Sequence, residues 1–181
     1  MRVAAVVVNY YTGPLLGDCL RRELVLVDNG SPPGEIDALL TAIDDRRVVR
    51  LDLPSNPGFA VACNHAARAC QSPWLLFLNP DCLVEPDTLD RLARTAQVHE
   101  RLAVLGALLV DTQGRPDPAS LRRDPLPRRA IASALGLDRL STIEGVTLPL
   151  AAGQTQALRV DAISGALMLI RRDAFNAVRG G

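Results

Sequence analysis

The chain has 181 residues, of which 48% are hydrophobic, so it is long enough and apolar enough to form one domain with a buried core. Twenty basic and twenty acidic side chains cancel, which argues against bulk electrostatic binding of nucleic acid. Four cysteines without a CxxC pair, together with only two histidines, argue against a structural zinc site. One domain over residues 1–181 is predicted.

Six apolar segments are predicted to form strands. The first four are largely apolar runs, which are typical of central parallel strands that are covered on both faces. In chain order the predicted strands are Arg2–Val8, Glu23–Val27, Arg47–Leu51, Trp74–Leu78, Leu102–Val110 and Leu158–Ile163.

Apolar residues at helical spacing predict three helices between these strands. The stripes run from Ile36 to Ile43, from Phe59 to Cys70 and from Leu89 to Ala96. The second stripe consists largely of small residues, as expected for a helix packed closely on a sheet. Because strand and helix alternate, we predict an α/β, Rossmann-like fold with a mostly parallel central sheet and helices on both faces.

Two connections are unusual. Only thirteen residues, Tyr10–Arg22, join the first two predicted strands, and they include Thr12–Gly13–Pro14, which is poor helix material. Either the connecting helix is stunted or residues are absent near Cys19–Arg22, and we favour absence. The segment 112–153 is predicted to be a long irregular loop because prolines and glycines interrupt it. Its arginines indicate either a solvated loop or a contact with phosphate or a membrane surface: Arg122, Arg123, Arg128 and Arg129.

Polar residues follow three of the predicted strands: Asn9–Tyr10, Asp28–Ser31 and Asn79–Asp81. Each set alone is also what a turn requires. Ligands of open parallel sheets bind at the carboxyl ends of the strands, so three such sets at one edge favour a binding site. The Asp28 carboxylate can accept hydrogen bonds from a base or a ribose, and Asp81 offers hard oxygen to Mg²⁺ or Mn²⁺.

Two further segments contain small residues beside polar ones. Asn56–Gly58 forms a glycine turn before a predicted helix, whose N-terminal N–H groups favour anions, and Asn64 follows on that helix. For Asn64 the alternative is an ordinary polar residue on the exposed helix side. Ser164, Gly165 and Ala166 leave room for a sugar or an acceptor near the backbone, or simply lead into a strand.

Five short motifs occur in order: Val-Val-Val-Asn-Tyr (6–10), Val-Asp-Asn-Gly-Ser (27–31), Asn-Pro-Gly-Phe-Ala (56–60) with Asn64, Leu-Asn-Pro-Asp (78–81) and Ser-Gly-Ala-Leu-Met-Leu-Ile-Arg-Arg (164–172). Together they resemble the family-2 glycosyltransferases, specifically their bacterial rhamnosyltransferase-like branch. The resemblance spans nearly the whole chain. It implies a GT-A fold and transfer of a sugar from a nucleotide diphosphate sugar with inversion at the anomeric carbon.

The resemblance also implies a role for each matching residue. Asp81 would hold Mg²⁺ or Mn²⁺, in place of the last aspartate of the DxD motif, which reads Asn-Pro-Asp here. Asn9, Tyr10 and Asp28 would contact the nucleoside, and Asn56, Gly58 and Asn64 would line the base or ribose. Ser164, Gly165 and Ala166 would lie near the donor sugar and the acceptor. Asn29, Ser31 and Asn79 are also implied to bind the nucleotide sugar.

The catalytic base is not identified within the chain. In the family a Glu-Asp pair beyond the Gly-Gly that corresponds to Gly180–Gly181 supplies this base, and we therefore expect the domain to be incomplete at its C-terminus. Asp161, within a predicted strand, is the weak substitute, and Asp173 is predicted to open a helix. Without a base the chain is expected to bind the donor better than it transfers the sugar.

The predicted function is that of an inverting glycosyltransferase, with rhamnose as the candidate sugar and a glycan or lipid-linked acceptor, as in cell-wall or polysaccharide biosynthesis. The expected location is the cytoplasm, with the inner face of the membrane as an alternative. The rival predictions are a catalytically inactive nucleotide-sugar-binding domain and, less favoured, a sugar nucleotidyltransferase. A dinucleotide-dependent oxidoreductase would need GxGxxG after the first strand, which the sequence lacks.

Overall fold

The computed structural model describes residues 3–9, 23–43, 48–85, 87–111, 113–117, 120–122 and 157–179. The chain divides into two compact units, the first formed by Met1–Leu105 with Gly165–Gly181 and the second by Gly106–Ser164. The predicted unusual connection at Tyr10–Arg22 and most of the predicted loop 112–153 lie outside the described residues.

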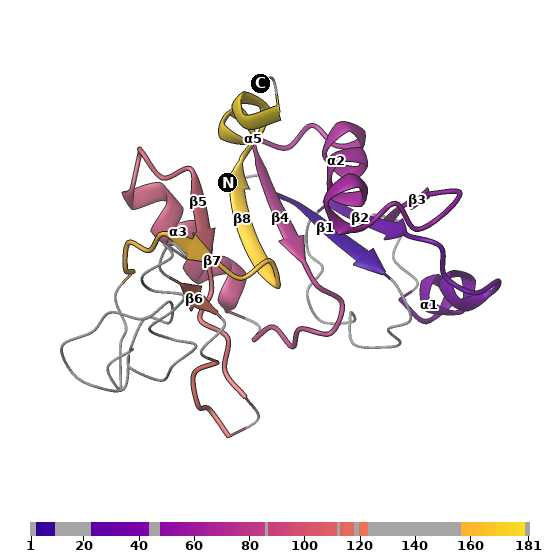
Figure 1. Cartoon of the computed structure of the whole chain (residues 1–181), viewed down its shortest axis with the longest axis horizontal. Coiled ribbons are helices and arrows are strands. Elements are labelled where there is room, and N and C mark those ends of the chain that lie inside the picture. Colours follow the sequence, from indigo (N-terminus) through magenta and orange to yellow (C-terminus); the bar gives the residue numbers. More distant parts are fainter. Residues whose placement is uncertain are drawn as a thin grey trace, which may run out of the picture. The chain divides into compact units, whose positions relative to one another are not determined.

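A six-stranded sheet with the order β3-β2-β1-β4-β8-β5 forms the centre of the first unit (Figure 1). β1 pairs in parallel with β2 and with β4, β2 pairs in parallel with β3, and β8 runs antiparallel to β4. This confirms the predicted α/β fold with a mostly parallel sheet. The strands are β1 (Val3–Asn9), β2 (Glu23–Asp28), β3 (Val48–Asp52), β4 (Trp74–Leu78), β5 (Val104–Gly106) and β8 (Leu167–Arg171).

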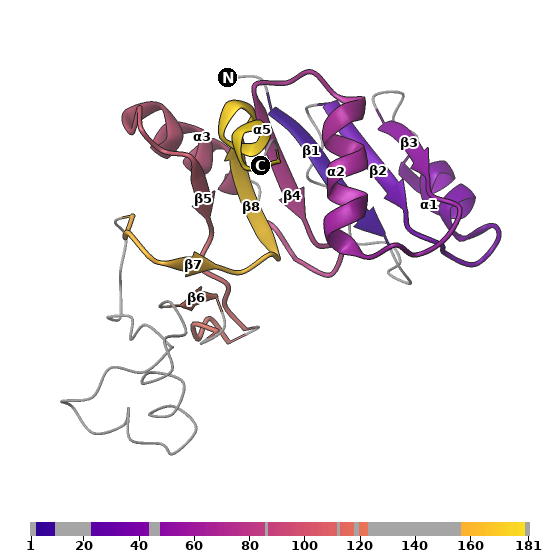
Figure 2. The same ribbon diagram turned by 45° about the horizontal axis from the view of Figure 1, so that its top comes forward.

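Helices follow the sheet strands where the apolar stripes predicted them: α1 (Glu35–Ile43), α2 (Phe59–Ala69) and α3 (Thr88–Val98), with α5 (Arg172–Arg179) near the C-terminus. α2 lies across β1 and β2 (Figure 2). Its small residues Ala62, Cys63 and Ala66 are buried against the sheet, which explains why this stripe lacks large side chains. Among the described residues, no helix is long and apolar enough to cross a membrane.

Both faces of the central strands β1, β2 and β4 are buried, and this accounts for the continuous apolar runs in the sequence. On the face that α2 covers, Val6, Val25 and Phe77 belong to one hydrophobic cluster. The alternate residues of the same strands, such as Val7 and Leu26, point to the other face and are fully buried as well. A strand that is covered on both faces cannot alternate between apolar and polar residues.

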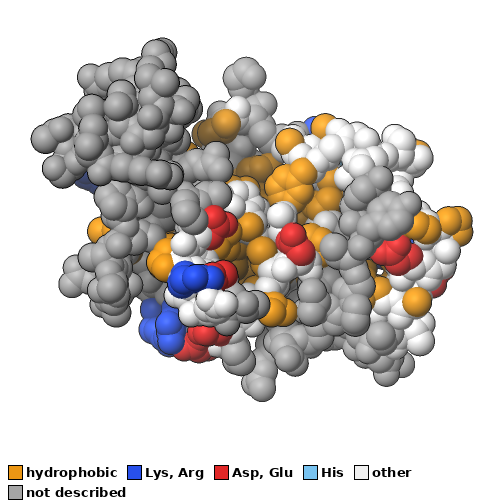
Figure 3. Space-filling view, turned by 60° about the horizontal axis from the view of Figure 1, so that its bottom comes forward, with side chains coloured by type: hydrophobic (Ala, Val, Ile, Leu, Met, Phe, Trp, Pro, Cys, Tyr) orange, Lys and Arg blue, Asp and Glu red, His pale blue; other side chains and the backbone are white. Residues whose placement is uncertain are grey.

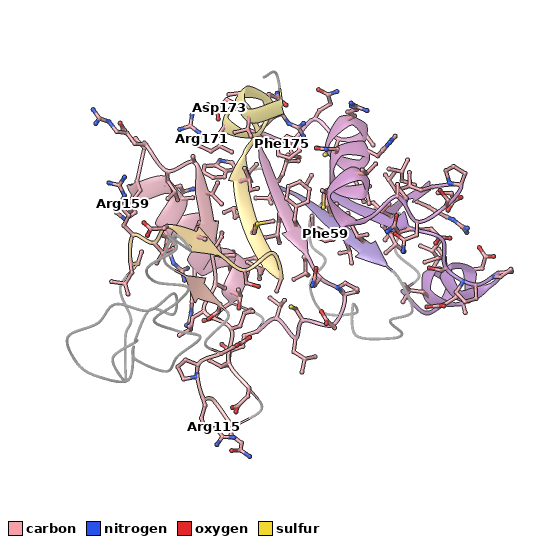
Figure 4. All side chains as sticks on the ribbon, viewed as in Figure 1. Phe59, Arg115, Arg159, Arg171, Asp173 and Phe175 are labelled. Atoms are coloured by element: carbon pink, nitrogen blue, oxygen red, sulfur yellow. The ribbon has the colours of Figure 1, made fainter. Side chains whose placement is uncertain are left out.

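α5 packs on the same face as α2, at the end of the sheet where β4 begins. The rings of Phe77 and Phe175 lie 5.6 Å apart, centroid to centroid. Figure 4 shows Phe175 beside Arg171 and Asp173 at this end, away from the carboxyl ends of the parallel strands. Asp173 lies in the first turn of α5, which confirms that it opens a helix. Hydrogen bonds from Arg171 and from the Ala174 N–H lower the pKa of the Asp173 carboxyl.

The second unit contains a small two-stranded sheet. β6 (Leu121–Arg122) pairs antiparallel with β7 (Ala162–Ile163), and the Ser164 N–H donates to the Ser120 carbonyl at 3.1 Å. Gly106 belongs to this unit as well, where a side chain in its place would meet Ile163 at 3.0 Å.

Three sequence predictions are wrong at the level of single elements. The strand predicted over Leu102–Val110 is reduced to β5, because Leu108 and Val110 are exposed and the chain turns away to form an isolated bridge with Pro116. The strand predicted over Leu158–Ile163 is reduced to β7, so Asp161 lies just before a strand instead of within one. β8 was missed because its apolar run was interpreted only as part of a motif.

Candidate functional site

The carboxyl ends of β1, β2 and β4 meet at one edge of the sheet. These strands are adjacent and parallel, with Asn9 in register with Asp28 and Val7 in register with Leu78. Asp28 is the last residue of β2, and Asp81 follows β4 by three residues. The predicted placement of both carboxylates at this edge is therefore confirmed. Figure 3 shows the molecule with the lower end of Figure 1 turned toward the reader, and acidic side chains, in red, are exposed in this view.

The turn after β2 is held in a fixed shape by Asp28. The Ser31 N–H donates to Asp28 Oδ1 at 2.8 Å, and the Leu53 N–H donates to the Asp28 carbonyl at 2.9 Å. Within this turn, between Asp28 and Ser31, Gly30 adopts a positive φ of 91°. A Cβ at this position would lie 3.3 Å from the Asn56 backbone nitrogen. Only glycine allows both this backbone conformation and this close approach.

Asn29 and Asn56 connect this turn to the segment that precedes α2. Asn56 Oδ1 accepts a hydrogen bond from the Gly58 N–H at 3.0 Å, which identifies this atom as the oxygen. The Asn29 Nδ2 therefore donates to it, at 2.7 Å. Asn29 is only 3% exposed, and its Oδ1 has no hydrogen-bond partner among the described residues. A buried acceptor of this kind normally requires a water or a ligand donor.

Arg50 on β3 lies beside three carboxylates. It hydrogen-bonds Asp52 and Asp37, and its Nη2 lies 3.8 Å from Asp28 Oδ2. The Asp28 side chain is only 15% exposed, whereas that of Arg50 is 34% exposed. The hydrogen bond to Asp52 is the main cause that raises the pKa of Arg50, and Asp37 adds to it. The guanidinium is therefore charged at every relevant pH.

A second group of predicted residues meets where β4 and β8 adjoin. The Asn79 N–H donates to the Ala166 carbonyl at 2.8 Å, so the end of β4 is tied to the turn that leads into β8. Cys82 Sγ lies 3.7 Å from the same carbonyl and 3.9 Å from Asp81 Oδ1. Burial raises the pKa of the Cys82 thiol, and the Asp81 charge raises it further. The thiol is therefore a neutral neighbour of Asp81.

The donor atoms near Asp81 fit a divalent cation only when a ligand completes the coordination. The Asp81 side chain is exposed, and Asn79 is half-buried beside it. Within the described part of the chain, no group of three His, Cys, Asp or Glu residues could hold a metal by itself. Mg²⁺ and similar cations are commonly held by one or two carboxylates together with substrate phosphates. A single carboxylate at the edge of the sheet, such as Asp81, suits this shared coordination by protein and substrate.

The other predicted residues are less closely connected. Asn64 is half-buried on α2, and Gly165 is exposed before β8. Asn9 ends β1, next to Asp28 in the sheet, whereas Tyr10 lies outside the described residues. Ser164 and Asp161 belong to the second unit.

Sequence reasoning missed two residues of this edge, Arg50 and Cys82. The signal for Arg50 was present, because an arginine stood in an apolar strand two residues before Asp52, beside the strand that ends in Asp28. Cys82 had no such signal, because only the fold brings its thiol to the Ala166 carbonyl.

Residues 7–178 match the sequence profile described as "Glycosyl transferase family 2". The chain is 26% identical over 178 residues to an N-acetylglucosaminyl-diphospho-decaprenol L-rhamnosyltransferase of Mycobacterium tuberculosis, an alignment that covers 87% of this chain and 54% of that protein. It is also 34% identical over 70 residues to an uncharacterized glycosyltransferase of Haemophilus influenzae, covering 38% of this chain and 28% of that protein. The chain thus spans about half the length of the mycobacterial relative.

Solved structures share the fold. The mannosyltransferase PcManGT from Pyrobaculum calidifontis, in complex with GDP-Man and Mn²⁺, matches with a TM-score of 0.62 and 17% identity over 98% of this chain and 46% of that chain. S. aureus TarS 1-349 in complex with UDP-GlcNAc matches with a TM-score of 0.52 and 19% identity over 68% of this chain and 39% of that chain. At such identities the likeness concerns the fold alone.

Proposed function

This chain belongs to glycosyl transferase family 2, and we propose that it is the nucleotide-sugar-binding part of an inverting glycosyltransferase. The observation that carries this proposal is the placement of Asp28 and Asp81 at the same edge of the sheet, at the ends of the two strands that flank β1. A nucleotide diphosphate sugar has a nucleoside at one end and a charged diphosphate near the other. Two carboxylates at this edge suit these two ends for different reasons.

Asp28 is proposed to bind the nucleoside. Its Oδ1 already accepts the Ser31 N–H, so Oδ2 is the atom that can receive a hydrogen bond from a ribose hydroxyl or a base N–H. Asn29 and Asn56 are proposed to stabilise the nucleoside end of the site, since their side-chain amides are hydrogen-bonded to each other. The unpartnered Asn29 Oδ1 is a further acceptor at this end.

Asp81 is proposed to act at the diphosphate. It would hold Mg²⁺ or Mn²⁺, and the cation would supply positive charge to stabilise the departing nucleotide diphosphate. Without a cation, an exposed carboxylate would repel the diphosphate. The small residues Gly165 and Ala166, which the Asn79 hydrogen bond holds beside the end of β4, are proposed to leave space for the donor sugar.

Calorimetric titration with the diphosphates of uridine, thymidine and guanosine, with and without Mn²⁺, tests this function. We expect one nucleotide to bind, and Mn²⁺ to strengthen its binding. Asp81→Asn should abolish the Mn²⁺ effect, Asp28→Asn should weaken binding even without Mn²⁺, and Asp90→Asn on α3 serves as the matched control. Failure of every nucleotide to bind, or unchanged affinity in both site variants, would contradict the proposal.

For the sugar we propose rhamnose, and for the acceptor a glycan or a lipid-linked glycan. The support is the mycobacterial relative, whose name states L-rhamnosyl transfer to a lipid-linked acceptor. Competition among nucleotide sugars tests the first choice: a rhamnose donor should displace a bound nucleotide at lower concentration than glucose, mannose or N-acetylglucosamine donors with the same base. Equal displacement by all donors would remove the support for rhamnose.

A domain that binds the nucleotide sugar without transferring it is the second candidate. Asp161, the only predicted substitute for a base, belongs to the second unit. Release of nucleotide diphosphate in the presence of an acceptor distinguishes the two, because only transfer produces it. Asp161→Asn would then show whether this residue takes part.

A further inference from the structure

We propose that Arg50 is a positioning residue of the nucleoside end of the site, which acts by orienting the carboxylate of Asp28. This inference rests on the proposed function, since it assumes that Asp28 receives the nucleoside. Neither Arg50 nor its two hydrogen-bond partners, Asp52 and Asp37, belong to the five motifs that identify the family. The inference comes from the placement of one cation among three carboxylates of the first unit.

The sheet register brings Arg50 and Asp28 to the same face. Leu26 is in register with Arg50, and Asp28 is in register with Asp52. Paired residues of adjacent parallel strands point to the same side, and residues two apart on a strand share that side. Arg50, Asp52 and Asp28 therefore all project from the face opposite α2.

Both oxygens of Asp28 are held, but in different ways. Oδ1 accepts a hydrogen bond from the Ser31 N–H at 2.8 Å, whereas Oδ2 lies 3.8 Å from Arg50 Nη2. The latter distance is that of an ion pair and exceeds that of a hydrogen bond. Arg50 therefore attracts Oδ2 and fixes the plane of the carboxylate, while Oδ2 keeps its lone pairs for a ligand donor.

Arg50 is itself fixed from two other sides. Its guanidinium hydrogen-bonds Asp52 on its own strand and Asp37 on α1. A planar guanidinium that is held at two edges loses little further freedom when it pairs with a third group. A lysine in this place would supply the charge but could not hold this geometry, so the two residues are not equivalent here.

The charges also indicate which part of a nucleotide fits. Three carboxylates and one guanidinium leave this group of side chains with an excess of negative charge. A diphosphate would be repelled there, while the hydroxyl and N–H donors of a nucleoside would be attracted. If Arg50 were lost, the remaining carboxylates would repel one another and Asp28 would no longer hold one orientation.

The test compares Arg50→Gln with Arg91→Gln, which removes an exposed arginine from α3. Calorimetry measures the affinity for the nucleoside diphosphate that binds best and for inorganic pyrophosphate with Mn²⁺. We expect Arg50→Gln to weaken nucleotide binding about ten-fold, on the scale of one lost charge-assisted contact, and to leave pyrophosphate binding unchanged. Arg50→Lys should recover part of the affinity, and Arg91→Gln should change neither value.

A double-mutant cycle ties the effect to Asp28. In an Asp28→Asn background, Arg50→Gln should change nucleotide affinity less than two-fold. Equal loss of nucleotide and pyrophosphate binding, or the same ten-fold loss in both backgrounds, would overturn the positioning role. If Arg50→Gln does not fold, Asp37→Asn replaces it: a smaller, nucleotide-only loss supports the role and an unchanged affinity overturns it. If the unaltered chain binds no nucleotide, the proposed function itself fails.

Discussion

The side chains of Asn29 and Asn56 are joined by a hydrogen bond of 2.7 Å, although 27 residues separate them in the sequence. This bond fastens the turn after β2 to the segment before α2. The two motifs in which these residues stand are therefore one structural unit at the carboxyl edge of the sheet.

The loss of this bond should lower stability. Asn56→Ala would leave the buried amide of Asn29 without a partner, which costs about 1–3 kcal/mol in the free energy of unfolding. Asn176→Ala on the exposed side of α5 is the matched control and should change stability by less than about 0.5 kcal/mol. Urea denaturation measures both. An equal effect of the two substitutions would show that the bond contributes nothing.

Gly30 should tolerate a side chain less well than Gly34. Both glycines have positive φ, 91° and 85°, so alanine strains the backbone at either position. Only at Gly30 would the new Cβ also approach another segment, 3.3 Å from the Asn56 nitrogen, whereas Gly34 has nothing within 4 Å. Backbone strain of this kind costs about 1–3 kcal/mol. Thermal unfolding should show Gly30→Ala as the more destabilising, and the reverse order would contradict the close approach.

Arg172 should matter more for stability than its neighbour Arg171. Its guanidinium donates to the carbonyls of Ala67 and Ser72, at 2.8 and 2.6 Å, and to Cys70 Sγ at 3.2 Å, so it caps the end of α2. Hydrogen bonds to charged groups contribute about 1.5–3 kcal/mol each.

Arg172→Met should therefore lower the free energy of unfolding by at least about 2 kcal/mol. Arg171→Met is the control, since Arg171 forms an exposed ion pair with Asp173 and one bond to a carbonyl. Denaturant midpoints of the two variants decide the matter. If Arg171→Met lowers the free energy of unfolding as much as Arg172→Met does, the cap on α2 does not account for the stabilisation.

Cys63 should make the protein less stable at alkaline pH. Burial raises the pKa of its thiol from 9.0 to about 12. Above pH 9 the unfolded chain loses this proton while the folded chain keeps it, so the unfolded state binds fewer protons and stability falls as pH rises.

The fall should continue, by about 1.4 kcal/mol per pH unit, until the pH reaches the folded pKa. Cys63→Ala removes this contribution, so between pH 8 and pH 10 the unaltered protein should lose about 1.4 kcal/mol more than the variant does. Urea denaturation at both pH values measures the difference. An equal loss of stability in both proteins would show that another group causes the alkaline sensitivity.

The sequence allowed the sheet to be predicted well where strands are buried on both faces. β4 begins and ends where its apolar run does, and β1 and β2 differ from the prediction by one residue at each end or less. The more exposed strand β3 was also predicted to within one residue at each end. The side chains of a continuous apolar run are all buried only when the strand is covered on both faces. β5 and β7 were predicted too long, because apolar residues such as Leu108 stay exposed when no neighbouring strand or helix covers them.

The edge of the sheet was predictable, but its internal bonds were not. Parallel neighbours must end at the same edge, so the common position of Asp28 and Asp81 follows from strand order alone. The bond between Asn29 and Asn56 depends on how two turns approach each other, and no periodicity in the sequence encodes that. The role of Arg172 in capping α2 could not be predicted for the same reason, since its partners lie about a hundred residues earlier.

The position of β8 has a consequence for the synthesis of this protein on the ribosome. β8 lies between β4 and β5, yet it is made after the whole of Gly106–Ser164. Until residue 171 has left the exit tunnel, one edge of β4 has no partner strand. The unpaired N–H and C=O groups of such an edge readily pair with other chains. The sheet is thus finished only when β8 emerges, and a nascent chain that stalls before β8 would need a chaperone at β4.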